Sequence, residues 1–277
     1  MTARRAFVVG WPVAHSRSPL IHRFWLKRHG IDGDYRAEAV PPDAIEGFLS
    51  SFAEHGYCGG NVTLPHKEAA FRACKVLTPV ARQLEAANTL WLEGSTLHGD
   101  NTDAYGFAAN LDENVKDDWR GGGNALVLGA GGAARAVIFA LVEAGYRSVA
   151  VLNRTPARAV ALAEHFGAPV RAGGLDLIPE LLPSADIVVN TTSAGLDGDT
   201  SLKIDWREAR PDAIATDLVY VPLVTPFLAA AAEHGLNVVD GLGMLLHQAV
   251  PGFEHWFGAR PTVDPELRAL VVADLDK

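Results

Sequence analysis

Hydroxyl, amide, amine and carboxylate side chains gather in four short segments of the first part of the chain. The segments are His15-Ser16-Arg17-Ser18-Pro19, Asn61-Val62-Thr63-Leu64-Pro65-His66-Lys67, Ala87-Asn88-Thr89 and Gly99-Asp100-Asn101-Thr102-Asp103. Each lies where a predicted strand ends or a predicted helix begins, which is where open α/β sheets bind ligands. Taken singly, Ser18, Thr63 and Asp103 are equally well explained as helix N-caps. Together the segments indicate a polar small-molecule site.

A glycine-rich turn marks a second candidate site. Gly129-Ala130-Gly131-Gly132-Ala133-Ala134 follows an apolar run and opens a helical pattern. In the G-x-G-x-x-A pattern the first glycine allows the tight turn, the second lets main-chain N–H groups approach a pyrophosphate, and the alanine keeps helix and strand close. The helix N-terminus adds partial positive charge. A plain strand-to-helix turn is the alternative, but the order strand, turn, helix, strand favours a dinucleotide site.

The residue after the second strand of that unit indicates which dinucleotide binds. An NAD site usually carries Asp or Glu about 20 residues past the glycines, to hold the ribose hydroxyls. Here the residue is Asn153, followed by Arg154, Thr155 and Arg158. Without a repelling carboxylate, two guanidinium groups favour a ribose 2′-phosphate, so we expect NADP. The alternative is that both arginines are merely the solvated start of a helix.

The elements that must position these residues alternate between apolar β-rich runs and helical patterns. Strands are expected at 6–9, 35–39, 60–63 and 88–92, and helices at 19–28, 42–54 and 65–73. A new unit begins after 119–123, with strands at 125–128, 148–152, 187–190 and 214–217 and helices at 133–144 and 156–166. The pattern predicts an α/β protein of two domains. The first has a mainly parallel sheet, and the second is a doubly wound Rossmann unit.

The domain boundaries follow from these elements. We expect a substrate-binding catalytic domain over 1–103 and an NADP-binding Rossmann domain over 104–239. The tail 240–277 has apolar residues at helical spacing and no strand of its own. We therefore expect it to form helices that pack back on the first domain.

Composition excludes several classes of partner. The 277 residues include 24 Lys and Arg against 33 Asp and Glu, a formal charge of −9 without a basic stripe, which argues against nucleic-acid binding. No apolar run reaches the ~18 residues of a membrane span, so we expect a cytoplasmic protein. The sequence does not reveal the oligomeric state, and a monomer or a homodimer is expected. Cys58 and Cys74 lack the spacing of a zinc site, and none of the ten histidines shows H-x-x-x-H or H-E-x-x-H spacing. We expect no metal.

Taken together, the motifs resemble the shikimate dehydrogenase family, NADP-dependent enzymes that interconvert 3-dehydroshikimate and shikimate on the route to aromatic amino acids. The resemblance covers nearly the whole chain. Its most specific elements are Gly10-Trp11-Pro12-Val13-Ala14-His15-Ser16-Arg17-Ser18-Pro19, Asn61 to Lys67, Gly99 to Asp103, Asn153-Arg154-Thr155, and Gly241-Leu242-Gly243-Met244-Leu245-Leu246-His247-Gln248-Ala249.

The resemblance implies a role for each matching residue. The substrate carboxylate would be held by Ser16 and Ser18, with Tyr220 reaching toward it, and the ring hydroxyls would meet Thr63, Asn88, Asp103 and Gln248. The implied cofactor residues are Gly129, Ala130, Gly131, Gly132, Ala133, Asn153, Arg154, Thr155, Arg158, Gly241 and Met244.

Lys67 and Asp103 would form the catalytic pair. Oxidation of a secondary alcohol needs a group that takes the hydroxyl proton while the hydride leaves. A helix start favours the neutral amine of Lys67, whereas a nearby Asp103 carboxylate favours the ammonium form, so which effect dominates stays open. We assign Lys67 as the principal proton-transfer group and Asp103 as the partner that orients the hydroxyl. An exposed lysine without a catalytic role is the alternative.

Two other functions stay open at this point. Relatives in the family act on quinate or aminoshikimate, and some use NAD. Quinate carries an extra hydroxyl on the carbon that bears the carboxylate, and the intact Ser16 and Ser18 favour the planar, unsaturated acid. A ligand sensor without turnover is a further alternative, against which the presence of both Lys67 and Asp103 argues.

Overall fold

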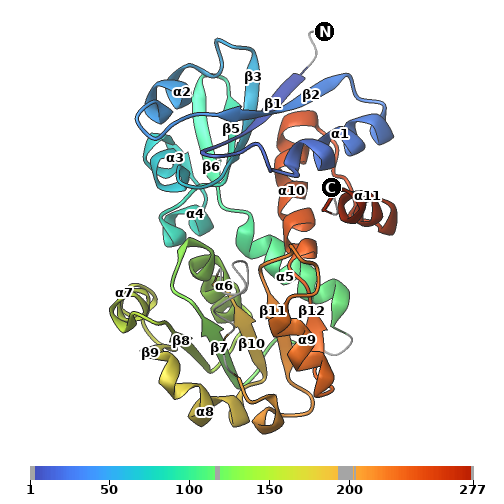
Figure 1. Cartoon of the computed structure of the whole chain (residues 1–277). Helices are drawn as coiled ribbons and strands as arrows, with labels where there is room; N and C mark the ends of the chain where they lie inside the picture. Colours follow the sequence, from blue (N-terminus) through green and yellow to red (C-terminus); the bar gives the residue numbers. More distant parts are fainter. Residues whose placement is uncertain (1–3, 116–118, 193–201, 203, 276–277) are drawn as a thin grey trace. The chain divides into compact units, whose positions relative to one another are not determined.

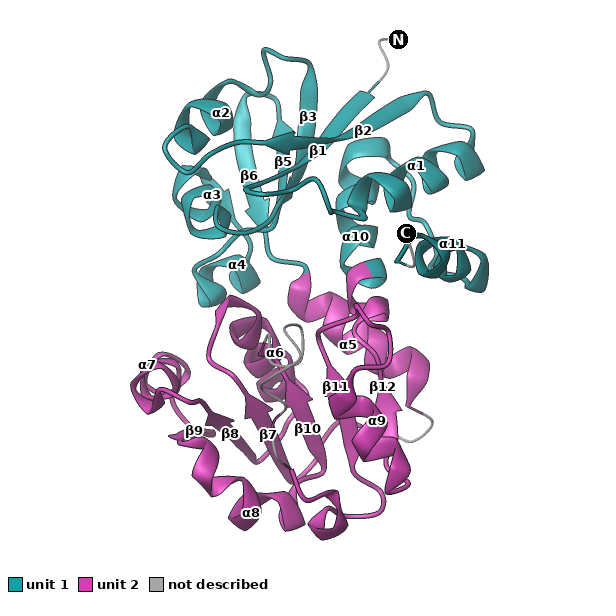
Figure 2. Cartoon of the chain, viewed as in Figure 1, with its two compact units in different colours: residues 1–102, 246–277 teal, residues 103–245 magenta. Residues whose placement is uncertain are grey.

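The computed structural model describes residues 4–115, 119–192, 202 and 204–275. It divides into two compact units (Figure 2). Unit 1 comprises Met1–Thr102 with Leu246–Lys277, and unit 2 comprises Asp103–Leu245. The chain thus leaves unit 1 after one hundred or so residues and later returns to it. The substrate-binding and NADP-binding roles expected for the two parts stay predictions.

Unit 1 contains a six-stranded mixed sheet in the order β2-β1-β3-β5-β6-β4. Its strands are β1 (Arg4–Gly10), β2 (Gly33–Ala39), β3 (Tyr57–Val62), β4 (Val76–Leu77), β5 (Thr89–Glu93) and β6 (Thr96–Asp100). β1 pairs in parallel with β2 and β3, and β4 with β6, whereas β5 runs antiparallel to both β3 and β6. The α/β class is confirmed. The sequence analysis missed β4 and β6, so it did not foresee the β5–β6 hairpin.

The helices of unit 1 are α1 (Ser18–His29), α2 (Ile45–Ser51), α3 (Lys67–Ala73), α4 (Pro79–Leu84) and α11 (Pro265–Leu275), with α10 (Leu242–Phe257) crossing the unit boundary. α2 and α3 begin two or three residues later than expected from Pro42 and Pro65. The unexpected α4 does have an N-terminal signal in the sequence, because Thr78 Oγ1 accepts from Ala81 N at 3.2 Å and Pro79 occupies the first turn. The helix has six residues, and its apolar face is too short to show helical periodicity.

The C-terminal helices pack on the sheet and on α1, as expected (Figure 1). The indole Nε1 of Trp256 in α10 donates to the carbonyl of Leu90 in β5 at 2.7 Å. Trp25 in α1 donates in the same way to Thr262 at 3.1 Å, ahead of α11. Gly59 gives Trp256 room, because a Cβ there would lie 2.6 Å from the indole nitrogen. Residues near both ends of the chain therefore form one core.

A buried histidine sits inside this core. The His22 ring stacks on Tyr35 with centroids 4.0 Å apart, and Trp25, Phe253 and Trp256 surround it. Its side chain is fully buried, and neither ring nitrogen has a hydrogen-bond partner among the described residues. Because burial penalises the charged form, the pKa of His22 is lowered to about 3. The imidazole is neutral at physiological pH.

Unit 2 contains a six-stranded sheet in the order β12-β11-β10-β7-β8-β9, parallel throughout, which is the Rossmann arrangement. Its strands are β7 (Asn124–Leu128), β8 (Ser148–Leu152), β9 (Val170–Gly173), β10 (Ile187–Asn190), β11 (Ile214–Asp217) and β12 (Asn237–Val239). Its helices are α5 (Asp103–Asn114), α6 (Gly132–Glu143), α7 (Pro156–Phe166), α8 (Ile178–Leu181) and α9 (Pro226–Glu233). The doubly wound prediction is confirmed, although the short edge strands β9 and β12 were missed.

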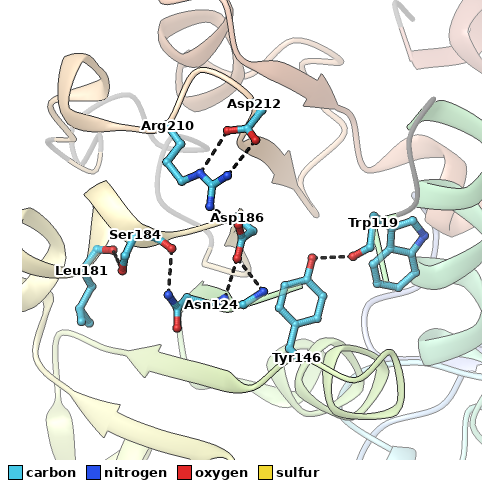
Figure 3. Close-up of polar contacts among 9 residues, drawn as sticks. Trp119, Asn124, Tyr146, Leu181, Ser184, Asp186, Arg210 and Asp212 are labelled. Carbon is cyan, nitrogen blue, oxygen red and sulfur yellow. Dashed lines mark hydrogen bonds and ion pairs between the residues drawn. The ribbon is translucent and has the colours of Figure 1, made fainter. Parts of the chain in front are cut away.

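A charged cluster fixes the start of β7 (Figure 3). Asp186 Oδ2 accepts from the main-chain N–H groups of Gly123 and Asn124, both at 2.7 Å, and its Oδ1 pairs with Arg210 at 2.6 Å. Tyr146 donates to the carbonyl of Trp119 at 2.8 Å in the same region. These contacts hold the amino end of the strand whose other end carries the glycine turn.

The neutral state of His22 predicts a pH dependence of stability. The unfolded chain takes up a proton near pH 6.5, whereas the folded chain does so only near pH 3, so the free energy of unfolding falls as the pH drops between these values. The slope is about 1.4 kcal/mol for each pH unit. We expect His22→Phe, which keeps an aromatic ring in the cluster, to remove this component. Urea unfolding between pH 7 and pH 5 measures it.

The exposed His29 provides the control, because His29→Gln should leave the slope of the wild type unchanged. Equal slopes for the wild type and His22→Phe would show that His22 protonates in the folded state.

Candidate functional site

Two loops of unit 1 that carry predicted substrate residues lie in contact at the carboxyl ends of β1 and β3. Trp11 N donates to the carbonyl of Leu64 at 3.0 Å. A Cβ on Gly10 would lie 2.5 Å from Thr63 Cγ2, so only glycine allows this approach. The segment that follows β1, which contains Ser16 and Ser18, and the segment that follows β3 therefore begin side by side.

Ser18 does not act as the helix cap that one interpretation of the sequence assigned to it. It is the first residue of α1, the cap position is Arg17, and no side chain makes a capping bond there. Ser18 is buried, and its N–H donates to Ser16 Oγ at 3.3 Å. The Ser18 side chain makes no capping bond and instead hydrogen-bonds to Tyr35 in β2.

The segment from Thr63 to Lys67 also differs from the capping interpretation. The cap of α3 is His66, again without a side-chain bond, so the expectation of Thr63 as a cap is wrong. His66 is buried, and its Nε2 lies 2.7 Å from the carbonyl of Val40. Lys67 is half-buried at the first position of α3. Its carbonyl accepts from Ala87 N at 3.0 Å, next to Asn88.

Asn88 is the centre of a buried polar cluster that also contains Gln248. Asn88 Oδ1 accepts from Thr89 Oγ1 at 2.8 Å and from the main-chain N–H of Thr102 at 2.9 Å, and its Nδ2 donates to Gln248 Oε1 at 3.4 Å. Thr102 Oγ1 donates to the carbonyl of Gln248 at 2.8 Å. The structure thus brings two predicted substrate residues together from positions 160 residues apart in the chain.

Asp103 begins α5 in unit 2, directly after Thr102. Its side chain is almost fully buried. Because the helix starts at Asp103 itself, this residue belongs to the first turn rather than preceding it, so the expectation of Asp103 as an N-cap is wrong. A carboxylate in the first turn suits the positive end of the helix dipole.

The glycine turn of unit 2 has the geometry that a pyrophosphate needs. Gly129 has φ 112°, and a Cβ there would lie 2.5 Å from Thr191 Oγ1, so the turn requires glycine. A Cβ on Gly131 or Gly132 would meet no heavy atom of the described residues within 4 Å. Ala134 is buried against the sheet. The main chain at the N-terminus of the twelve-residue α6 is therefore open to a ligand, as a dinucleotide phosphate site requires.

The segment after β8 is folded as a turn that exposes two arginines. Asn153 Nδ2 donates to the carbonyl of Thr155 at 3.0 Å, and Arg158 N donates to the same carbonyl at 3.1 Å. Arg154 and Arg158 are exposed, and within the described part of the chain no carboxylate pairs with either. Arg207, an exposed arginine elsewhere in unit 2, pairs with Asp205 at 2.6 Å. Two unpaired guanidinium groups fit a ribose 2′-phosphate.

Tyr220, Gly241 and Met244 lie around the carboxyl end of β11 and the start of α10. A Cβ on Gly241 would lie 2.5 Å from the carbonyl of Leu218, so the loop before Tyr220 passes directly against Gly241. Asp217 fixes that loop, because its carboxylate accepts from Val219 N at 3.0 Å and from Thr225 Oγ1 at 2.7 Å. Burial raises the pKa of Asp217. Sequence reasoning did not give Asp217 this role.

Burial favours the protonated form of both thiols. Burial raises the pKa of Cys58 and raises that of Cys74 to about 12.

Within residues 4–115, 119–192, 202 and 204–275, no cluster of three or more His, Cys, Asp or Glu side chains is arranged to hold a metal ion. In the same ranges no helix combines the length and apolarity that a membrane crossing demands.

Three family models match the chain. They describe a shikimate dehydrogenase substrate binding domain at residues 8–90, shikimate / quinate 5-dehydrogenase at 113–199, and a shikimate 5′-dehydrogenase C-terminal domain at 241–270.

Curated relatives match along nearly their full length. A shikimate dehydrogenase (NADP(+)) of Sinorhizobium medicae is 54% identical over 274 residues, which are 98% of this chain and 96% of the relative. A protein of the same name from Brucella melitensis is 55% identical over 277 residues, 99% of this chain and 96% of that one. Among solved structures, shikimate 5-dehydrogenase of Thermus thermophilus in complex with NADP(H) and shikimate has a TM-score of 0.86 and 42% identity, covering 99% of this chain and 100% of the other.

Proposed function

Because the chain belongs to the shikimate dehydrogenase family, we propose that it catalyses the reversible NADP-dependent reduction of 3-dehydroshikimate to shikimate, a step toward the aromatic amino acids. The observation that carries this proposal is the 54% identity over 98% of the chain to a relative named shikimate dehydrogenase (NADP(+)). The polar cluster of unit 1 and the open glycine turn of unit 2 support it.

Unit 1 supplies most of the proposed substrate contacts. Ser16 and Ser18 donate to the carboxylate, and Thr63, Asn88 and Gln248 meet the ring hydroxyls. These groups are neutral, so they select by hydrogen-bond geometry rather than by net charge. Tyr220 from unit 2 is proposed to reach the carboxylate.

Unit 2 supplies the cofactor site. The main-chain N–H groups of the turn at residues 129–133 bind the pyrophosphate, and Arg154 and Arg158 bind the 2′-phosphate, with Asn153 and Thr155 shaping the turn between them. Gly241 and Met244 complete the proposed site. When bound, NADP(H) donates or accepts the hydride at its nicotinamide ring.

Lys67 and Asp103 perform the proposed acid–base chemistry. In the direction of reduction, the carbonyl oxygen of 3-dehydroshikimate becomes an alkoxide as hydride arrives, and the Lys67 ammonium gives it a proton. In oxidation Lys67 takes the proton back. Asp103 accepts a hydrogen bond from the hydroxyl and orients it, and the two groups share the proton as a coupled pair.

A matrix of initial rates tests the function as a whole, crossing shikimate and quinate with NADP and NAD. We expect shikimate with NADP to give the highest kcat/KM, by about tenfold or more over each other combination, because the two serines and the two arginines act on independent groups. A higher kcat/KM with quinate would instead identify the protein as a quinate dehydrogenase. Absence of turnover with all four pairs would support a ligand sensor.

Loss of the Lys67 amine should remove proton transfer but not binding. We expect Lys67→Ala to lower kcat by about 10²- to 10⁴-fold with little change in the KM of shikimate, since a general acid acts in the transition state. Steady-state kinetics with NADP in excess measures both constants. Lys27→Ala, at an exposed lysine of α1, is the control and should retain full activity. A change confined to KM would exclude a catalytic role.

Loss of an unpaired guanidinium should affect one cofactor more than the other. Arg154→Ala is expected to raise the KM of NADP about tenfold or more, because a charge-assisted bond to the 2′-phosphate is lost, and to leave the KM of NAD within about twofold. The matched control is Arg207→Ala, an exposed arginine of unit 2 that pairs with Asp205. Equal effects on both cofactors would remove Arg154 from the 2′-phosphate site.

The proposal also covers the location, the oligomeric state and the ligands of the protein in the cell. We place it in the cytoplasm, where the substrates of a biosynthetic reductase are found, and expect a monomer or homodimer. Small molecules are its proposed ligands, with nucleic acid and membrane excluded on the composition.

A further inference from the structure

A buried chain of hydrogen bonds lies behind Asn88 and has no role in the proposed function so far. It begins at Tyr35 in β2, whose hydroxyl donates to Asn61 Oδ1 at 2.6 Å. Asn61 Nδ2, at the end of β3, donates to Thr89 Oγ1 at 3.2 Å and to the carbonyl of Asn88 at 3.1 Å. Thr89 Oγ1 donates in turn to Asn88 Oδ1 at 2.8 Å. Tyr35 and Thr89 are fully buried.

Two main-chain groups determine the orientation of both carboxamides in this chain. The N–H of Thr102 can only donate, so the Asn88 atom that it meets at 2.9 Å must be the carbonyl oxygen. The carbonyl of Asn88 can only accept, so the Asn61 atom that it meets at 3.1 Å must be the amide nitrogen. Each carboxamide therefore has one orientation that suits its main-chain partner, and the assignment of its oxygen and nitrogen atoms rests on that partner.

The hydroxyl protons then follow. Thr89 Oγ1 accepts from Asn61 Nδ2, so its single proton goes either to Asn88 Oδ1 at 2.8 Å or to Thr102 Oγ1 at 3.1 Å, and the shorter contact favours Asn88 Oδ1. Tyr35 must donate, because the Asn61 atom facing it is an oxygen. Burial raises the pKa of Tyr35 well above its usual value, so the phenol keeps this proton at every physiological pH.

We propose that Thr89 and Asn61 are positioning residues that lock the Asn88 carboxamide with its N–H group toward the substrate, so that the enzyme selects a ring oxygen that accepts a hydrogen bond at this point. The inference rests on the proposed function, since it takes Asn88 as a substrate-binding residue. With Oδ1 turned toward Thr89 and Thr102, Nδ2 is the polar atom that faces the other way, where it also meets Gln248 Oε1.

The locked orientation explains why a neutral amide can be selective. A flipped carboxamide would place Nδ2 against the N–H of Thr102, two donors facing each other in a buried site. Without Thr89 and Asn61, Oδ1 would keep the N–H and the hydroxyl of Thr102 but lose the Thr89 donor, and the side chain would have more freedom to turn. A fixed donor rejects a ligand that offers its own donor or an apolar group there, because a buried polar group would lose its partner.

A pair of substitutions at Thr89 separates orientation from packing. Thr89→Val keeps the branched shape and removes the hydroxyl, whereas Thr89→Ser keeps the hydroxyl and removes a methyl group. We expect Thr89→Val to raise the KM of shikimate about tenfold, the effect of one lost hydrogen bond, and Thr89→Ser to stay within about twofold. The KM of NADP should change in neither. Equal effects of Val and Ser, or no effect of Val, would overturn the proposal.

A double-mutant cycle with Asn88→Ala tests whether Thr89 acts through Asn88. Once Asn88 is gone, Thr89→Val should have no further effect on the KM of shikimate. Multiplying effects would overturn the inference and leave the proposed function intact. An unchanged KM in Asn88→Ala alone would instead remove Asn88 from the substrate site, so the two failures are distinguishable.

Tyr35→Phe provides a second variant should Thr89→Val not fold. It removes the hydroxyl that donates to Asn61 Oδ1 and that also hydrogen-bonds to the Ser18 side chain, and we expect it to raise the KM of shikimate several-fold. Tyr57→Phe is the matched control, because the Tyr57 hydroxyl bonds to Glu38 in the same unit, away from this chain. If both tyrosine variants give the same KM, the polar chain does not position Asn88.

Discussion

Unit 1 depends on the return of the chain to it. The sequence leaves this unit at Thr102 and comes back at Leu246, and the returning helix α10 is fixed by the bond from Trp256 to the carbonyl of Leu90. Thr89 directly precedes Leu90 in β5, and its hydroxyl is proposed to orient Asn88. The same helix carries Gln248 to that amide. The bond from Trp256 to Leu90 and the bond from Thr102 to the carbonyl of Gln248 both join α10 to this unit, so the polar residues of α10 and of the sheet meet only after the chain returns.

The sequence predicted the fold where the pattern of residues is local. Buried parallel strands such as β7, β8 and β10 are continuous apolar runs, and their expected bounds agree with the structure to within a residue. Three of the missed strands, β4, β9 and β12, lie at sheet edges, where half-exposed residues give no alternation. The hairpin from β5 to β6 was missed for a related reason, since Thr96–Asp100 reads as a polar segment and pairs only because β5 lies beside it.

The candidate site was predictable as a set of segments but not as a network. Residue types located Thr63, Lys67 and Asn88 at strand ends, because polar residues there are expected in parallel sheets. They did not reveal that Asn61 turns inward to Tyr35, which lies 26 residues away on β2. His66 shows the same limit, since its burial depends on Val40, which follows a neighbouring strand. Propensity describes a residue and its near neighbours, whereas these partners are supplied by the tertiary fold.

The two units apply different physics to recognition. In unit 1 the amides of Asn61 and Asn88 are neutral, buried and locked by main-chain groups, so a mismatched ligand leaves a polar atom unpaired where water cannot replace it. In unit 2 Arg154 and Arg158 are exposed charges, which attract a phosphate over a longer distance but are weakened by solvent and salt. The first arrangement suits discrimination between hydroxylated rings that carry the same charge. The second suits two cofactors that differ by one phosphate, because there the charge itself is the difference to be recognised.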